Sequence, residues 1–233
     1  MAKKKTTTNA MQKTATATER MEAIFKRVGA DHNYSDVAVE ITPFKDFKVK
    51  WTRSCNWIRF QVVDYLADMP SNVLEDFADN IFARIQGEDV RYPPSVIDYL
   101  TSDGFRTAHR DTFFSRTGLR SEEWLTASLD RLTAKGLVRV RDVQLGAFSK
   151  PDSRISTKSS LLFRVVAVNS KLAEDLTDDE LDCAVYQALC FLETRSFGAD
   201  PVDGDRRMTE ALDRMENYSK LEFAIVKKGY HMS

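Results

Sequence analysis

The segment from residue 176 to 195 has a spacing that could serve metal chemistry, but it lacks the side chains. Its centre reads Gln-Ala-Leu-Cys-Phe over residues 187–191, within a helix-forming run. A zinc peptidase motif of the His-Glu-x-x-His type places two imidazoles one helical turn apart, with a glutamate beside the first as general base. Gln187 and Phe191 cannot replace imidazoles, and Ala188 has no proton-accepting group. The segment therefore predicts a helix without zinc-dependent hydrolysis.

The other residues capable of metal or acid-base chemistry do not rebuild such a site. The three histidines are His32, His109 and His231. None has a second ligand at helical i, i+4 spacing, so surface or structural roles are expected. Asp182, Glu193 and Glu210 lie near the altered turn, where carboxylates could bind a hard cation or act as acid and base. Because solvated helix faces are the commoner place for such residues, no metal or catalytic role is assigned to them.

Composition excludes some classes of protein and sets an expected compartment. The chain has 34 Lys+Arg against 35 Asp+Glu, so no overall field steers it toward polyanions. Its three cysteines include no Cys-x-x-Cys pair, which is typical of reduced thiols packed in an interior. The first residues contain no apolar run of the kind that a signal peptide or membrane span requires. We therefore expect a cytoplasmic protein with no membrane partner.

The hydrophobic pattern predicts the organisation of the chain. Residues 1–18 are expected to form a flexible basic tail, and residues 19–233 a single α+β domain. The predicted strands cover residues 37–41, 47–53, 57–66, 137–145 and 161–168, with the second and third joined as a hairpin. The predicted helices cover residues 19–28, 72–85, 95–102, 121–136, 177–195 and 206–226.

The order of three sequence blocks resembles a known family. The blocks are FKVKWTRSCNWIRFQVVDYLADMPSNVLEDFADNIFARI, LLFRVVAVNSKL and LDCAVYQALCFL. Over about residues 35–222 they resemble the SprT-like or YgjP-like zinc metallopeptidases, the minimal gluzincins. The resemblance implies a zincin-like scaffold, in which a small, mostly antiparallel sheet packs against helices around a central active-site helix. It aligns Gln187, Ala188 and Phe191 with the family's His, Glu and His, and Gly204 with a further histidine, so the family's zinc is expected to be absent and no cofactor is predicted.

This resemblance, together with the missing ligands, predicts a catalytically inactive pseudopeptidase that binds an unknown protein or peptide partner. Active relatives are expected to hold an extended peptide along an edge strand by main-chain pairing, a mode that needs no metal. The strand predicted over residues 161–168 or the neighbouring hairpin is the expected edge.

Nucleic-acid binding is the alternative hypothesis. Residues 121–145 have the helix, glycine and strand rhythm of half a winged helix, and Arg139 and Arg141 add local positive charge. Residues 92–114 supply no clear first helix and tight turn before it. On the hairpin, Trp51, Trp57 and Arg59 alternate aromatic and basic character. Such alternation indicates either a stacking platform for single strands or one core face and one solvent face.

Overall fold

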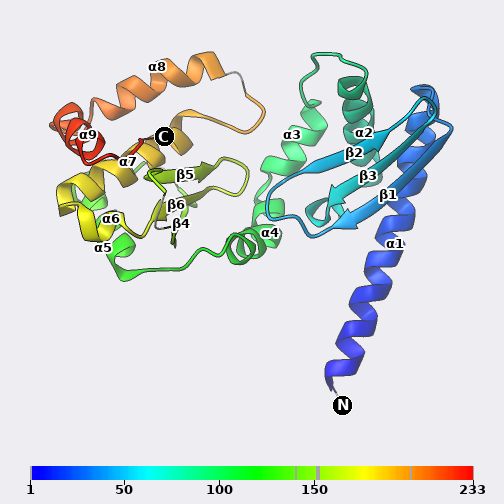
Figure 1. The fold of residues 1–233 in the computed structure, drawn as a ribbon, viewed down its shortest axis with the longest axis horizontal. Helices are drawn as coiled ribbons and strands as arrows, with labels where there is room; N and C mark the ends of the chain where they lie inside the picture. Colours follow the sequence, from blue (N-terminus) through cyan, green and yellow to red (C-terminus); the bar gives the residue numbers. More distant parts are fainter. Residues whose placement is uncertain (1, 140, 151–152, 200, 233) are drawn as a thin grey trace. The chain divides into compact units, whose positions relative to one another are not determined.

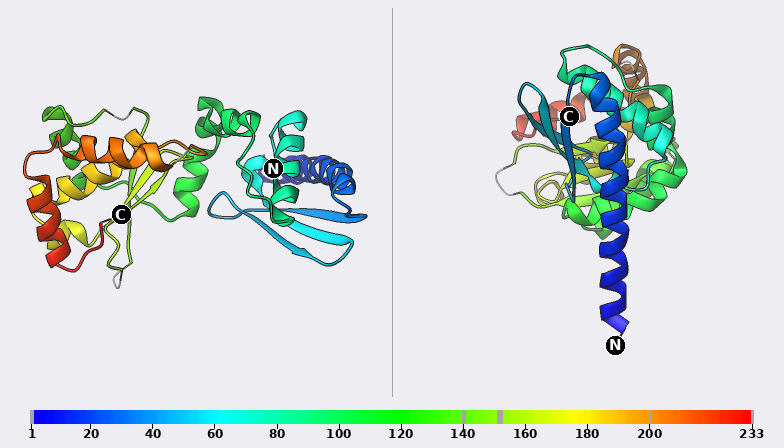
Figure 2. Two further views of the ribbon diagram at one scale, coloured as in Figure 1. Left: turned by 90° about the horizontal axis from the view of Figure 1, so that it is seen from above. Right: turned by 90° about the vertical axis from the view of Figure 1, so that its right-hand side faces the viewer.

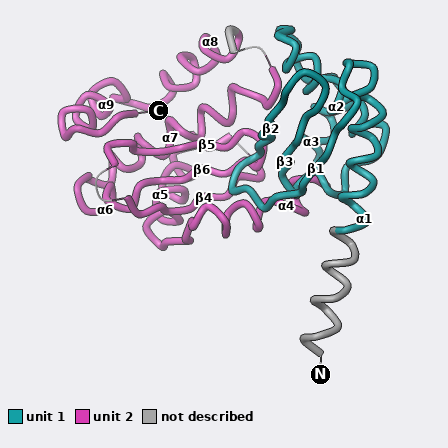
Figure 3. The backbone as a smooth tube through the Cα atoms, turned by 45° about the vertical axis from the view of Figure 1, so that its right-hand side comes forward, with its two compact units in different colours: residues 1–102 teal, residues 103–233 magenta. Residues whose placement is uncertain are grey.

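The chain divides into two compact units, residues 1–102 and 103–233 (Figures 1 and 3). The computed structural model describes residues 2–139, 141–150, 153–199 and 201–232, without the side chains of residues 2–14, 201 and 202. Each unit contains its own sheet. The single domain over residues 19–233 stays a prediction. The boundary leaves little trace in the sequence because helix α3 is followed by α4 after one extended residue, Ser102, with no Gly- or Pro-rich linker.

Unit 1 is built from two long helices, a three-stranded sheet and one shorter helix. Its elements are α1 (Ala2–Asp31), β1 (Asp36–Thr42), β2 (Val49–Arg53), β3 (Trp57–Val63), the 3-10 turn η1 (Asp64–Leu66), α2 (Ser71–Ile85) and α3 (Pro94–Thr101). Helix α1 begins well before the predicted residue 19, within the segment expected to be a tail. The side chains of residues 1–14 lie outside the described part of the chain.

The sheet of unit 1 has the strand order β1-β3-β2 and is mixed rather than mostly antiparallel. Strands β2 and β3 form the predicted antiparallel hairpin, with Trp51 opposite Phe60. Strand β1 pairs with β3 in parallel, with Val39 opposite Phe60. The sequence predicted the strands but not this parallel pairing, because strand patterns carry no information on the order in which strands pair.

The core of unit 1 lies between one face of this sheet and helices α1 and α2, which lie on the same side of it (Figure 2). Alternating residues of β1 and β3 supply the buried sheet face: Val37, Val39, Ile58, Phe60 and Val62. Phe82 of α2 is fully buried and contacts the rings of Phe25, Tyr34 and Phe60, with centroids 5.3–6.2 Å apart. Gly29 allows this packing, because a Cβ atom there would lie 2.9 Å from Phe82 Cζ.

Unit 2 surrounds a central helix with a second small sheet and further helices. Its elements are α4 (Asp103–Arg116), α5 (Glu123–Ala134), β4 (Gln144–Phe148), β5 (Thr157–Ser160), β6 (Val165–Asn169), α6 (Leu172–Asp175), α7 (Asp178–Thr194), α8 (Pro201–Leu212) and α9 (Tyr218–Lys227). Helix α7 packs against α5, α8, α9 and strands β5 and β6. Thr177 and Glu180 form a complete capping box at its start, as the sequence indicates for the Thr177 cap.

The sheet of unit 2 is also mixed, with the order β4-β6-β5. Strand β6 is central, parallel to β4 and antiparallel to β5. The strand predicted over residues 137–145 begins only at Gln144, because helix α5 ends in a turn at Gly136 with a left-handed φ of 67°. The strand predicted from residue 161 begins at Val165, after a turn in which Arg164 has a φ of 52°. An α+β fold is thus observed, with two mixed sheets in place of one mostly antiparallel sheet.

Among the described residues, no helix combines the length and the apolar character that a membrane span requires.

Candidate functional site

The turn of α7 aligned with the zinc motif lies inside the core of unit 2. Gln187 is 8% exposed and Ala188 is 1% exposed, and the neighbouring Val185 and Leu189 belong to the same apolar cluster. The Gln187 side-chain oxygen has no hydrogen-bond partner among the described residues. The sequence predicted the helix, but not that this turn would be covered on all sides.

Phe191 and Gly204, two of the four positions that the sequence resemblance aligns with the zinc-site residues, both contact Arg195. The Arg195 guanidinium carbon lies 4.9 Å from the centroid of the Phe191 ring. A Cβ atom at Gly204 would lie 3.0 Å from Arg195 Cγ, so the absence of a side chain there makes room for the arginine. The guanidinium also forms an ion pair with Asp205.

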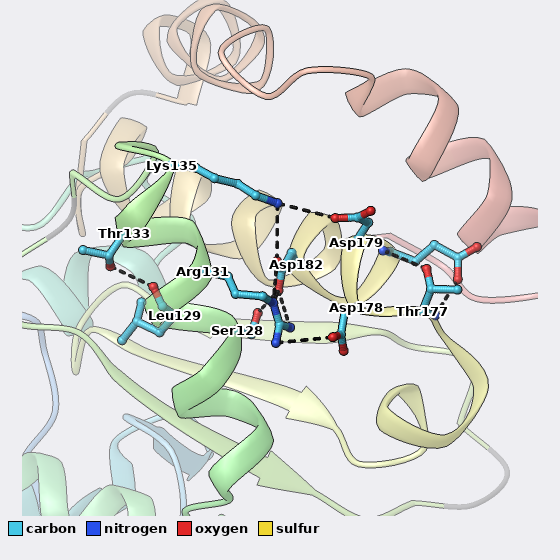
Figure 4. A network of polar contacts seen from close by, with 10 residues as sticks. Ser128, Leu129, Arg131, Thr133, Lys135, Thr177, Asp178, Asp179 and Asp182 are labelled. Atoms are coloured by element: carbon cyan, nitrogen blue, oxygen red, sulfur yellow. Dashed lines mark hydrogen bonds and ion pairs between the residues drawn. The ribbon is translucent and has the colours of Figure 1, made fainter.

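Asp182, which the sequence indicated as a solvated carboxylate, is instead the centre of a buried polar network (Figure 4). It is 1% exposed and accepts hydrogen bonds from Ser128 Oγ at 2.7 Å and from Arg131 Nε and Nη2 at 2.9 and 2.7 Å. The hydrogen bond to Asp182 raises the pKa of the Arg131 guanidinium. The sequence signal was the position of Asp182 within an otherwise apolar run, LDCAV, on a predicted core helix. The network ties α5 to α7.

The sequence predicts surface or structural roles for the histidines, and the contacts of His32 illustrate a structural one. His32 is hydrogen-bonded to Asp79 and Gln86 and stacks on Phe82. Burial alone lowers the pKa of His32, but the hydrogen bonds to Asp79 and Gln86 outweigh it and raise the pKa above its ordinary value. Within the described residues, no group of three His, Cys, Asp or Glu side chains is placed to hold a metal ion.

Two of the three cysteines, Cys183 and Cys190, are buried on α7, so their reactivity reports on the packing of this helix. Burial raises the pKa of Cys183 to about 12 and that of Cys190 to about 11, whereas Cys55 is exposed. Because the thiolate is the reactive form, we expect one thiol to react with Ellman's reagent at pH 8 in the folded protein and three after unfolding in guanidinium. Rapid reaction of a second thiol in the native protein would contradict the burial of α7.

In unit 1, Trp51 and Trp57 lie on opposite faces of the sheet. Trp51 is opposite Phe60 in the ladder and shares its face, whereas Trp57 is three residues from Phe60 on the same strand. Arg59 shares the face of Trp57, and its guanidinium lies 5.6 Å from the Trp57 ring. The two tryptophans therefore do not form a common stacking platform. The aromatic and basic residues are divided between the two faces, with Trp51 on the face that the helices cover and Trp57 and Arg59 together on the open face.

Arg139 and Arg141 are exposed and lie between α5 and β4, not on a strand. Helix α4 precedes α5, from which residues 117–122 separate it, so a helix lies in the block before residue 121 where the sequence indicated no clear first helix. The exposed side chains of α5 are Glu123, Thr126, Ala127, Asp130, Thr133 and Ala134. This outer face contains two carboxylates and no cation, so it is unsuited to contact phosphates.

Strand β2 is an edge strand that pairs with β3 on one side. Val63 N donates a hydrogen bond to Lys48 O, and Ser54 N donates one to Trp57 O. These two bonds show which residues of β2 direct their backbone groups toward β3. In an antiparallel ladder the bonded pairs alternate, so the N–H and C=O groups of Val49, Trp51 and Arg53 point away from β3. No other backbone group pairs with them among the residues that the structure describes.

The side chains along β2 are exposed and positively charged. Residues 50–53 are all exposed, and Trp51 is 46% exposed despite its size. Lys48, Lys50 and Arg53 form no ion pair with a carboxylate in the described part of the chain. Beside β2, on the sheet face opposite the helices, is a depression of about 450 Å³ lined by residues that include Lys50, Thr52, Arg59 and Gln61.

The other edge strands have different surroundings. In unit 2, β4 is bridged at Ala147 by Arg120, and the residues before β5 are bridged at Ile155 by His231. In unit 1, β1 packs against α1, and Val37 and Val39 are buried. Strand β6, expected as a possible edge, is the middle strand of its sheet and has partners on both sides. Of the two edges predicted for peptide pairing, only the hairpin is therefore placed to serve.

Comparisons of the chain with protein-family models, with curated proteins and with solved structures find no match.

Proposed function

We propose that the protein is a non-catalytic binding protein that takes up an extended segment of a partner as an additional strand on β2. The observation that carries the proposal is the unpaired edge formed by Val49, Trp51 and Arg53. Main-chain pairing along such an edge provides affinity, and side chains on alternating positions provide specificity. The family resemblance supports the same mode, because peptidase-like relatives are expected to hold peptides along an edge strand.

The surroundings of α7 support a role without catalysis. Gln187 and Ala188 lie in the core, and the Arg195 side chain packs against Phe191 and Gly204. The absence of catalytic zinc stays a prediction. The alternative of nucleic-acid binding is less well supported, since the exposed face of α5 carries Glu123 and Asp130.

A proline at residue 49 tests the proposed pairing. The Val49 N–H points away from β3, so Val49→Pro removes a donor from the free edge while leaving the hairpin bonds in place. Peptides selected from a displayed library of random nonapeptides are expected to bind the wild-type chain. Their affinity for Val49→Pro is expected to be at least tenfold lower, because one main-chain hydrogen bond is lost and the register of pairing is disturbed. Isothermal titration calorimetry of each selected peptide measures the change.

Val49→Ala is the matched control, because it shortens the same side chain and keeps the N–H group. It is expected to bind the selected peptides within about twofold of wild type. Far-UV circular dichroism and amide exchange of β3 verify that the sheet is intact in both variants. Equal affinity of Val49→Pro and Val49→Ala for every selected peptide would refute pairing on β2, as would a library from which no peptide is selected.

A further inference from the structure

A strand added beside β2 would have different side chains next to it on the two faces of the sheet. Side chains alternate between the faces of a sheet, so Lys48, Lys50 and Thr52 lie on the open face, and Val49, Trp51 and Arg53 on the face that the helices cover. A strand paired with β2 is pleated in the same phase. Its own side chains therefore also alternate between these two environments.

The open-face side of the edge is suited to carboxylates. Lys48 and Lys50 are exposed, and the Lys50 ammonium lies 5.0 Å from the centroid of the Phe44 ring rather than beside an acid. The nearest acidic residue in the same cross-strand row is Glu40, which is on β1, beyond β3, and which accepts a hydrogen bond from Gln61 at 3.1 Å. A carboxylate on an added strand would lie directly beside Lys50, at the distance of a cross-strand pair.

The other side of the edge is suited to an apolar side chain. Trp51 stands between Val49 and Arg53 on this side and is 46% exposed. The Arg53 guanidinium donates a hydrogen bond to the Tyr34 hydroxyl at 3.0 Å, which directs it toward the end of α1. An apolar residue opposite Trp51 would bury part of the indole and so remove apolar surface from water.

The positive charge of the β2 edge also opposes its pairing with the β2 edge of a second copy of this chain. Two β2 strands paired edge to edge would bring together the cations Lys48, Lys50 and Arg53 of both copies, with no carboxylate on either strand. Lysine on an edge strand is a common means of preventing such self-pairing. The same charges attract a strand of opposite sign.

We infer that the partner segment is an extended acidic strand in which carboxylates alternate with apolar residues, with the carboxylates on the side of Lys48 and Lys50 and the apolar residues on the side of Trp51. This inference rests on the proposed function, since it specifies the occupant of the same β2 edge.

Three labelled octapeptides test the inference by fluorescence anisotropy at 0.15 M salt: four Glu-Val repeats, four Gln-Val repeats and four Lys-Val repeats. The full-length chain is expected to bind the Glu-Val peptide at least tenfold more tightly than the Gln-Val peptide and to show the weakest binding to the Lys-Val peptide. Lys50→Glu is expected to weaken Glu-Val binding at least tenfold and to strengthen Lys-Val binding. Trp51→Ser is expected to lower the affinities for the Glu-Val and Gln-Val peptides by a similar factor.

Lys220→Glu is the charge-matched control, because Lys220 is exposed on α9 in unit 2 and the variant has the same net charge as Lys50→Glu. It is expected to leave all three affinities within about twofold of wild type. If the Glu-Val peptide binds Lys50→Glu as well as wild type, or if the three peptides bind equally, the inference is wrong. In that case retained sensitivity to Val49→Pro would leave the proposed function standing, whereas insensitivity to Val49→Pro would overturn both.

Discussion

Replacement of Asp182 by alanine is expected to destabilise unit 2 by about 3 kcal/mol. Asp182 is 1% exposed, and its removal leaves Ser128 and Arg131 without the acceptor that satisfies them. Breaking a buried ion pair typically costs about 3–5 kcal/mol. The lower end applies here, because the Arg131 side chain is 32% exposed and regains contact with water. Amide exchange of α5 and α7, measured by mass spectrometry, reports the loss as faster exchange in both helices.

Asp178→Ala is the matched control for this prediction. Asp178 lies 3.7 Å from the same Arg131 but is 80% exposed, so its loss is expected to change the free energy of unfolding by less than about 0.5 kcal/mol. A triple variant that combines Asp182→Leu, Arg131→Met and Ser128→Ala removes the carboxylate together with both of its hydrogen-bond donors. It is expected to recover most of the lost stability, since well-packed apolar replacements of buried ion pairs are often neutral. Equal effects of Asp178→Ala and Asp182→Ala would contradict the buried network.

Replacement of Phe82 by alanine is expected to destabilise unit 1 by about 4 kcal/mol. The Phe82 side chain is fully buried, and its centroid lies 5.3 Å from that of His32 as well as beside the rings described above. Deletion of the ring removes its apolar burial and leaves a cavity between α2 and the sheet, with Gly29 too small to fill it. Chemical denaturation followed by circular dichroism, together with amide exchange of β1 and β3, measures the loss.

Phe82→Leu provides the control, because it keeps most of the apolar volume while removing the ring. Its cost is expected to be about 1–2 kcal/mol, so that the difference between the two variants reports the cavity. Amide exchange in α7 of unit 2 serves as an internal reference, because a change confined to unit 1 leaves it unaltered. A loss below about 1 kcal/mol for Phe82→Ala would show that the aromatic cluster is not the core of unit 1.

Much of the local structure was predictable from the sequence, for identifiable physical reasons. The Thr177 cap and the apolar run from Leu181 to Leu192 predicted α7, because both signals are local. The Phe47–Arg53 and Trp57 segments predicted the hairpin, because a short polar connection between strands leaves few other arrangements. The apolar stripe of residues 73–85 likewise predicted α2.

Features that depend on distant partners were not predictable in this way. The parallel pairing of β1 with β3 and of β4 with β6 is decided by packing over whole units. The burial of Asp182 depends on Arg131, which is 51 residues away along the chain. The open edge of β2 was predicted only as one of two possibilities, because it depends on which strand occupies the middle of the sheet.

The strand orders β1-β3-β2 and β4-β6-β5 have a consequence for synthesis on the ribosome. In both sheets the middle strand is the last of the three along the chain. Strands β1, β2, β4 and β5 therefore all leave the ribosome before the middle strand with which each pairs, and neither sheet can form completely until Val63 or Asn169 has emerged. During that interval the outer strands lack a partner, and unpaired strand edges are prone to premature association.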